Sequence, residues 1–245
     1  MSPFHPSEAE IQARDRLIVA LDVPTATDAR KLADQLRGVC QWVKVGLELY
    51  IAAGNAIVEE LAGQGYSVFL DLKLHDIPNT VAGAVRSAAA AGASLLTVHS
   101  MGGTAMLTAA AEAAAKLPNP PRLLAVTVLT SMDAAQLAAI GVASTPAEEV
   151  LRLARIAQAS GIDGLVCSAQ EVGLLRRELG PAPFLVTPGI RPAGSDVGDQ
   201  KRVATPGHAI RAGANALVVG RPITHAPDPA KAAQAILADI ATAIS

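Results

Sequence analysis

Residues 68–80 have the sequence VFLDLKLHDIPNT, and this stretch contains the structural unit that decides the fold. The run from Val68 to Leu72 is short and mostly apolar, which is typical of a strand buried on both faces. Pro78 suits the first turn of a helix, because its missing N–H needs no partner there. The stretch therefore predicts a buried strand, a polar turn and then a helix.

The same unit recurs along the chain. Apolar runs alternate with helical segments, and we expect eight strands, at Leu17–Leu21, Trp42–Val45, Val68–Leu72, Leu95–Val98, Leu123–Leu129, Gly164–Cys167, Phe184–Val186 and Ala216–Val219. Strands that alternate with helices imply right-handed crossovers and a parallel sheet. Eight units favour an α/β fold, a (β/α)8 TIM barrel forming a single domain over residues 1–245, since such barrels use about 250 residues. A doubly wound open sheet is the alternative.

Helix boundaries are marked by capping residues. Thr145 can cap a helix that has Pro146 at its first position, and Glu148 completes a capping box. Gly161 is expected to end this helix. Its buried face is predicted from apolar residues at helical spacing, Val150, Leu153, Ala154 and Ala157. Caps of the same kind predict helices from Thr25 to Gly38 and after Asp228-Pro229.

Composition excludes several classes of function. Hydrophobic residues make up 51% of the chain and the formal net charge is -2, so there is no basic field for nucleic acid or an acidic membrane. Residues 1–15 are acidic and lack the apolar core of a signal peptide. The uncharged segment Ser87–Ala111 is too weakly apolar for a membrane span. Cys40 and Cys167 form no CxxC pair, and we expect a cytoplasmic protein with reduced thiols.

The charged residues at the end of the third strand are the most informative feature of the sequence. Side chains alternate along a strand, so Asp71, Lys73 and His75 share one face. A buried charge persists only when it is paired or functional, and Asp71 and Lys73 are spaced to pair. Asp76 has the opposite parity and lies beyond the strand. We therefore expect it to point toward the rim of the barrel, away from Asp71 and Lys73.

Other strand ends are also polar. Lys44 interrupts the apolar second strand and needs a partner, whereas Asp22 fits either a helix N-cap or a ligand contact. For His75 and His99, packing or capping roles are favoured over a chemical role. The strand ends of a TIM barrel build its active site, which favours grouping these residues there.

Two segments suggest a phosphate site. Gly220-Arg221 follows the eighth strand, where barrels often bind phosphate, and a guanidinium suits a dianion. The polar loop Arg191–Arg202 is of the kind that closes over a ligand, although an ordinary surface loop is the alternative.

These motifs together resemble those of the orotidine 5'-monophosphate decarboxylase family. The resemblance extends from about Leu17 to Thr224 and rests on LDVP, KVG, DLKLHDIPNT, TVLTSM, TPGIRP, GDQKR and VVGRPI, in that order. It implies conversion of orotidine 5'-monophosphate to uridine 5'-monophosphate without a metal or other cofactor. In this family Lys73 would donate a proton to C6 of the pyrimidine, and Asp71 would hold Lys73 and face the substrate carboxylate. Asp22 and Lys44 would bind ribose hydroxyls and extend the charge network.

The resemblance also implies a homodimer with a shared active site. Asp76, with Ile77 and Thr80, would enter the neighbouring subunit's site. Thr130 and Ser131 would lie beside the pyrimidine and ribose. The 5'-phosphate would be held by Arg191, Gln200, Gly220 and Arg221.

Two other functions compete with this interpretation. Metal-dependent sugar-phosphate decarboxylases and synthases of the same barrel group share the D-x-K-x-x-D element, but they place an acidic metal ligand at the end of the second strand. Lys44 occupies that position here and would repel a dication. A non-catalytic barrel that senses pyrimidine nucleotides is the second alternative.

Overall fold

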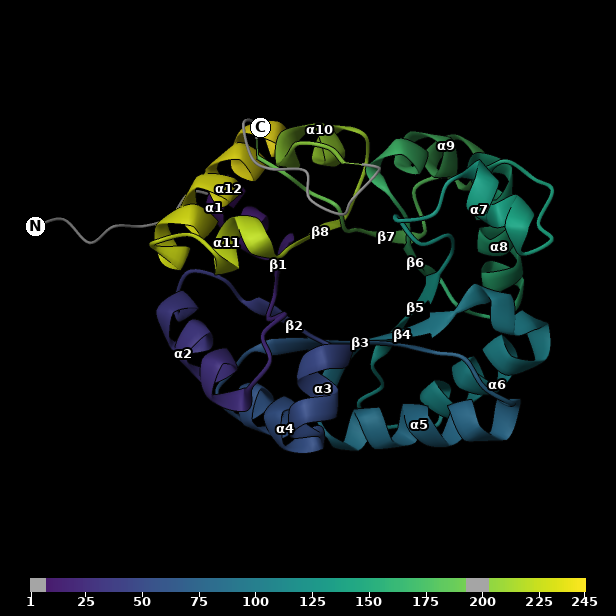
Figure 1. Cartoon of the computed structure of the whole chain (residues 1–245), viewed down its shortest axis with the longest axis horizontal. Helices are drawn as coiled ribbons and strands as arrows, with labels where there is room; N and C mark the ends of the chain where they lie inside the picture. Colours follow the sequence, from purple (N-terminus) through teal and green to yellow (C-terminus); the bar gives the residue numbers. More distant parts are fainter. Residues whose placement is uncertain (1–7, 193–202) are drawn as a thin grey trace, which may run out of the picture.

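Eight parallel strands close into a barrel in sequence order in the computed structural model, which describes residues 8–192 and 203–245 (Figure 1). The strands are β1 (Leu17–Ala20), β2 (Trp42–Gly46), β3 (Ser67–Leu74), β4 (Ala93–His99), β5 (Arg122–Val126), β6 (Gly164–Val166), β7 (Phe184–Thr187) and β8 (Ala216–Val219). All eight predicted strands are confirmed. Because β8 pairs with β1, the barrel is closed and the open doubly wound sheet is excluded.

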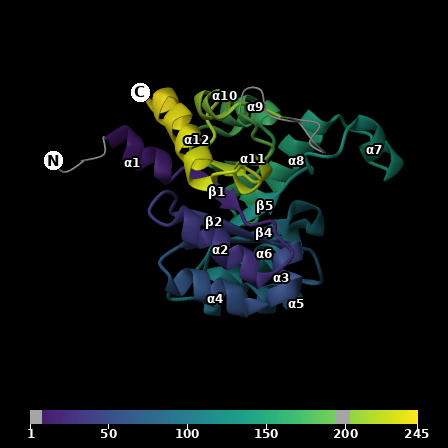
Figure 2. The same ribbon diagram turned by 60° about the vertical axis from the view of Figure 1, so that its left-hand side comes forward.

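Helices form the outer layer of the barrel (Figure 1). They are α1 (Glu8–Arg14), α2 (Ala26–Leu36), α3 (Leu47–Ala53), α4 (Asn55–Gly63), α5 (Pro78–Ala90), α6 (Gly103–Ala115), α7 (Ala134–Ala139), α8 (Pro146–Ala159), α9 (Ala169–Leu179), α10 (Pro206–Arg211), α11 (Arg221–Thr224) and α12 (Pro229–Ile244), with a 3-10 turn η1 (Ser100–Gly102). The first and last helices, α1 and α12, pack against each other, and α7 extends away from the barrel (Figure 2).

The predicted helix caps are present. Thr145 and Glu148 form the capping box that begins α8, and all four residues predicted for its apolar face are buried. Asp228 caps α12, and Thr25 caps α2 by accepting the backbone N–H of Asp28. Because Thr25 fills that position, Asp22 is not the N-cap of α2.

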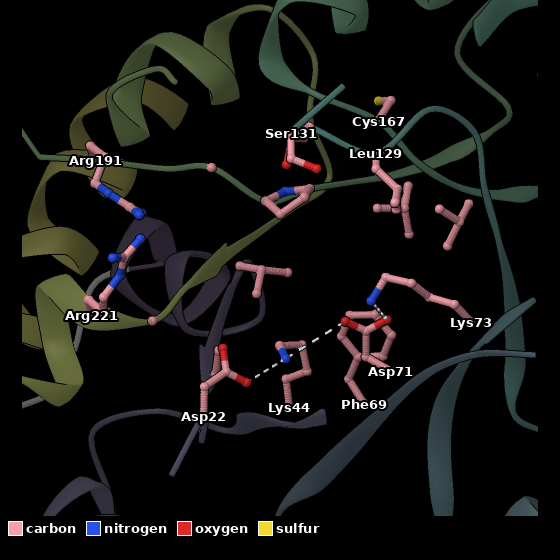
Figure 3. Close-up of a pocket in the computed structure, with 18 of the residues that line it drawn as sticks. Asp22, Lys44, Phe69, Asp71, Lys73, Leu129, Ser131, Cys167, Arg191 and Arg221 are labelled. Carbon is pink, nitrogen blue, oxygen red and sulfur yellow. Dashed lines mark hydrogen bonds and ion pairs between the residues drawn. The ribbon is translucent and has the colours of Figure 1, made fainter. Parts of the chain in front are cut away.

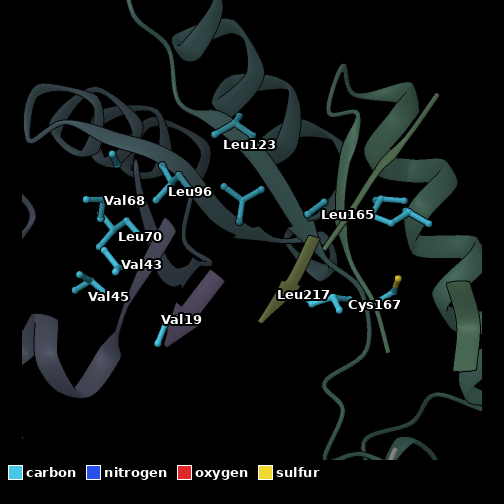
Figure 4. Packing of buried hydrophobic residues seen from close by; sticks show 14 of the residues in the cluster. Val19, Val43, Val45, Val68, Leu70, Leu96, Leu123, Leu165, Cys167 and Leu217 are labelled. Carbon is cyan, nitrogen blue, oxygen red and sulfur yellow. The ribbon is translucent and has the colours of Figure 1, made fainter. Parts of the chain in front are cut away.

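The strands contribute to two separate hydrophobic clusters. One contains residues of both strands and helices, so strand residues such as Val19, Val43 and Leu70 pack outward against the helical layer (Figure 4). The buried members of the other come from strands only: Ile18, Ala20, Phe69, Leu95, Leu124, Val186, Ala216 and Val218. These side chains fill the barrel interior. The two clusters explain why the strands are apolar at consecutive positions.

Most strand boundaries differ from the predicted ones by one to three residues, and two of the differences concern the site. β5 ends at Val126 rather than Leu129, because its neighbours β4 and β6 end opposite that residue, at His99 and Val166. β3 continues to Leu74, but its register against β4 shifts between Leu70 and Leu74.

None of the helices in the described part of the chain has the length and apolar character needed to cross a membrane.

Candidate active site

A cavity of about 540 Å³ opens at the carboxyl ends of the strands. Its lining comes from β1, β2, β3, β5, β6 and β8 and from the segments that follow β1, β5, β6, β7 and β8. Nine residues predicted for the site line this cavity: Asp22, Lys44, Asp71, Lys73, Thr130, Ser131, Arg191, Gly220 and Arg221. Residues far apart in the sequence meet here because a closed parallel barrel brings all its carboxyl ends to one face.

Four charged side chains form an alternating chain across the ends of the first three strands (Figure 3). The Nζ of Lys44 lies 2.8 Å from Oδ1 of Asp22 and 3.7 Å from Oδ2 of Asp71. The Nζ of Lys73 donates to Oδ1 of Asp71 at 2.9 Å. Lys44 is the most buried of the four, with a side chain 9% exposed, and it has the carboxylate partners that a buried ammonium requires.

The environment of Asp71 keeps this carboxyl ionised. Burial alone would raise its pKa, but the positive charges of Lys44 and Lys73 and hydrogen bonds from Lys73 and Thr97 outweigh that effect. The pKa of Asp71 therefore lies below its ordinary value.

A second cluster of charge lies across the cavity. Arg191 and Arg221 follow β7 and β8, and their guanidinium groups turn toward each other at the end of the cavity opposite Lys73 (Figure 3). Nη1 of Arg191 donates to the carbonyl oxygen of Ile190 at 2.9 Å, which fixes part of that side chain. Two guanidinium groups at one end suit a phosphate dianion, while the Lys73 end suits developing negative charge.

Three predicted residues lie outside this cavity. Asp76, Ile77 and Thr80 follow β3 on the exposed rim, and Ile77 is 66% exposed. The Asp76 carboxylate accepts the backbone N–H of Ile77 at 2.6 Å. Asp76 thus lies on the rim, as the parity argument predicted. Gln200, the remaining predicted residue, is outside the described residues, as is most of the Arg191–Arg202 loop.

The two histidines next to the site have packing and capping roles. The rings of His75 and His99 stack with centroids 5.4 Å apart. Nδ1 of His99 accepts the backbone N–H of Met101 and caps η1. Burial, followed by the nearby His75 and Lys73, lowers the pKa of His99.

Several lining residues were not predicted. Phe69 forms part of the floor, and its parity with Asp71 on the same strand was a usable signal. Val128 and Leu129 contribute apolar wall, while His225 follows α11 beside Arg221. The sequence around His225 carries no pattern that marks it as a lining residue.

The charge arrangement is unfavourable for a divalent cation. Within residues 8–192 and 203–245, no group of three or more His, Cys, Asp or Glu side chains is arranged to hold a metal ion. The ammonium of Lys44 lies between the carboxylates of Asp22 and Asp71, the two acidic groups of the cavity closest to it.

Comparison with known proteins gives a consistent result. Residues 15–236 match the model of the Orotidine 5'-phosphate decarboxylase / HUMPS family. The orotidine 5'-phosphate decarboxylase of Halorhodospira halophila is 56% identical over 228 residues, covering 93% of this chain and 97% of the relative. The orotidine 5'-phosphate decarboxylase of Anaeromyxobacter sp. is 55% identical over 226 residues, covering 92% of this chain and 98% of the relative. The crystal structure of the Lactobacillus acidophilus orotidine 5'-phosphate decarboxylase superposes with a TM-score of 0.82 at 41% identity, covering 92% of this chain and 99% of that one.

Proposed function

The chain belongs to the orotidine 5'-phosphate decarboxylase / HUMPS family, and on that premise we propose that it converts orotidine 5'-monophosphate to uridine 5'-monophosphate and carbon dioxide. The observation that carries the proposal is the Lys73 ammonium, held 2.9 Å from Asp71 in a cavity with two guanidinium groups at its other end. We place this reaction in pyrimidine nucleotide synthesis in the cytoplasm.

The reaction needs a stabilised carbanion. When the bond between C6 and the carboxylate breaks, the electron pair stays on an sp² carbon that has no adjacent carbonyl to delocalise it. A preorganised ammonium near C6 stabilises this charge as it develops. Lys73 then transfers a proton from Nζ to C6, and the neutral amine regains a proton from solvent. The chemistry proposed here uses no cofactor.

Asp71 serves the same step in two ways. Its ionised carboxylate accepts a hydrogen bond from Lys73 and so orients the ammonium. It also faces the carboxylate of the bound substrate, so that like-charge repulsion is relieved when carbon dioxide leaves. In this proposal Asp22 and Lys44 bind the ribose hydroxyls, which ties substrate orientation to the same chain of charges.

The far end of the substrate supplies binding energy. Arg191, Gly220 and Arg221 hold the 5'-phosphate, together with Gln200. Thr130 and Ser131 lie beside the pyrimidine and ribose, with Ser131 contacting the ring amide. Binding of the phosphate supplies energy remote from C6 that contributes at the reacting carbon.

We further propose that two copies of the chain share their active sites. Asp76, Ile77 and Thr80 lie on the exposed rim, outside their own cavity. Ile77 is 66% exposed, and contact with a second copy of the chain would remove this apolar side chain from water. In a homodimer these residues enter the neighbouring subunit's cavity, and Asp76 adds a carboxylate near Lys73.

A metal-dependent sugar-phosphate enzyme of the same barrel group is the competing function. Such an enzyme needs an acidic ligand where this chain has Lys44. Because that ammonium already pairs with Asp22 and faces Asp71, it opposes a dication at this position.

The test is a spectrophotometric assay of purified protein with orotidine 5'-monophosphate in the presence of EDTA. Loss of orotidylate absorbance and formation of uridine 5'-monophosphate are expected. Activity that disappears with the chelator would support the metal-dependent alternative. Tight nucleotide binding without turnover would support a non-catalytic sensor.

A further inference from the structure

Thr97 on β4 contacts both members of the Lys73–Asp71 pair. Its side chain is fully buried and does not line the cavity. Its Oγ1 accepts the backbone N–H of Lys73 at 2.8 Å and donates to Oδ1 of Asp71 at 3.0 Å. The same Oδ1 accepts from Nζ of Lys73 at 2.9 Å. One hydroxyl therefore closes a ring that contains the backbone of Lys73, its ammonium and the carboxylate beside it.

The backbone of Lys73 has an unusual conformation that needs such support. Its φ is +51°, and it is the only non-glycine residue with positive φ in the part of the chain that the structure describes. The cause lies in the strand register, because Leu70 pairs with Leu96 whereas Leu74 pairs with Val98. Four residues of β3 thus advance alongside two of β4, and Asp71 and Lys73 within this bulge line the cavity. At this bulge the hydroxyl of Thr97 serves as acceptor for Lys73 N–H.

The hydrogen-bonding capacity of a hydroxyl gives this contact a direction. A threonine hydroxyl carries one hydrogen and two lone pairs. A lone pair accepts the N–H of Lys73, and the hydrogen is donated to Asp71, because an ionised carboxylate can only accept. A hydrogen bond to an ionised carboxylate is stronger than one between neutral groups. The contact therefore favours the charged form of Asp71 and fixes its orientation.

We propose that Thr97 is a positioning residue for the decarboxylation, holding the bulge that aims Lys73 and orienting Asp71 against it. This inference rests on the proposed function, because it assigns Thr97 an effect on the step that Lys73 performs. A threonine that only fills space in β4 would make neither contact with the pair.

Four variants separate the two roles. Thr97→Val keeps the shape of the side chain and removes the hydroxyl. Thr97→Ala also removes the hydroxyl, without requiring an extra methyl group to fit. Thr97→Ser keeps the hydroxyl and removes only the methyl group. Thr127→Val is the matched control, because Thr127 is also fully buried but its Oγ1 donates to the carbonyl oxygen of Val166, away from the pair. Circular dichroism and thermal unfolding identify the variants that fold.

Activity is the first measurement. Both hydroxyl-free variants should lower kcat roughly tenfold to a hundredfold, the range for a lost hydrogen bond to a charged group, with little change in KM. Thr97→Ser should recover most of kcat, and Thr127→Val should retain it. Wild-type kcat in the hydroxyl-free variants, or an equal loss in Thr127→Val, would overturn the proposal.

The second measurement does not depend on the reaction. A carbon-13 NMR titration of the Asp71 carboxyl in the free protein should show a higher pKa in Thr97→Val and Thr97→Ala, but not in Thr97→Ser or Thr127→Val. An unchanged Asp71 titration in both hydroxyl-free variants would contradict the role of Thr97. Inactive wild-type protein with the expected titrations would instead contradict the decarboxylase function alone.

Discussion

The ammonium of Lys44 lies 2.8 Å from the carboxylate of Asp22, so an ion pair joins the ends of β1 and β2 inside the cavity. The two partners differ in solvent exposure, since the side chain of Lys44 is 9% exposed and that of Asp22 is 52% exposed. Lys44 can reach this position because residue 46 is glycine. A Cβ atom on Gly46 would lie 2.7 Å from Nζ of Lys44 and 3.0 Å from Oδ1 of Asp22.

Gly46→Ala is therefore expected to displace the Lys44 ammonium and lower kcat/KM by about a hundredfold, the cost of an error of roughly 1 Å in a catalytic site. Gly63→Ala in α4 is the control, because a Cβ there meets no atom within 4 Å. The control should keep full activity and gain about 0.5–1 kcal/mol of stability. Steady-state kinetics on both proteins test this, and wild-type activity in Gly46→Ala would show that the ion pair tolerates displacement.

Lys73→Ala is expected to lower kcat by at least about a thousandfold, because the variant loses both the electrostatic stabilisation of the carbanion and the proton donor. Thermal unfolding should remain cooperative, since the Lys73 side chain lies at the cavity and not in the core. Lys116→Ala, which removes an exposed lysine at the end of α6, is the control. Substantial turnover by purified, metal-free Lys73→Ala protein would contradict the assigned role.

The shared-site proposal predicts complementation between two inactive variants. Lys73→Ala and Asp76→Ala, each inactive alone, should regain activity when mixed under conditions that allow subunits to exchange. The mixed dimer contains one site with both an intact Lys73 and an intact Asp76. Exchange is verified by native mass spectrometry with one variant isotopically labelled. No recovery despite verified exchange would mean that Asp76 does not act across an interface.

The lowered pKa of Asp71 predicts a pH dependence of stability. A carboxyl with a lower pKa in the folded chain stabilises the fold at pH values above its unfolded pKa, about 3.9. This contribution decreases as the pH falls below about 4 toward the folded pKa. Urea unfolding of wild type and Asp71→Asn, from about pH 7 to about pH 3, measures this contribution of Asp71 to the free energy of unfolding. The wild-type advantage should shrink in acid, and a difference independent of pH would contradict the ion network.

Arg176 is predicted to matter for stability rather than chemistry. Its guanidinium donates to the carbonyl oxygens of Gly213, Gly180, Pro181 and Pro183 and to the side chain of Asn215. Arg176→Met leaves several of these acceptors unpaired and should lower the free energy of unfolding by about 2–4 kcal/mol. The control is Arg177→Met, at the exposed neighbouring residue, which should change the free energy of unfolding little. Denaturant unfolding measures both, and kcat per folded molecule should stay at the wild-type value.

Much of the fold was predictable because its determinants are local. The capping box at Thr145 and Glu148 and the apolar runs of the eight strands are patterns within a few residues of one another. Eight βα units then leave few topologies, since connections are short and right-handed. The parity of β3 also placed Asp71 and Lys73 together and Asp76 on the rim, because side-chain alternation is a property of a single strand. It was wrong for His75, which was predicted to share their face but lies outside the cavity lining, beyond the bulge at Lys73.

Other features of the site were decided only by the tertiary structure. The positive φ of Lys73 arises where β3 and β4 shift register, and that shift depends on both strands at once. Thr97 therefore looks like any buried strand residue in the sequence, although it holds Lys73 and Asp71. The convergence of Arg191 and Arg221 likewise depends on β7 pairing with β8. Sequence patterns determine which side chains a strand end presents, whereas barrel closure and register determine which of them meet, because those depend on contacts between residues far apart in the chain.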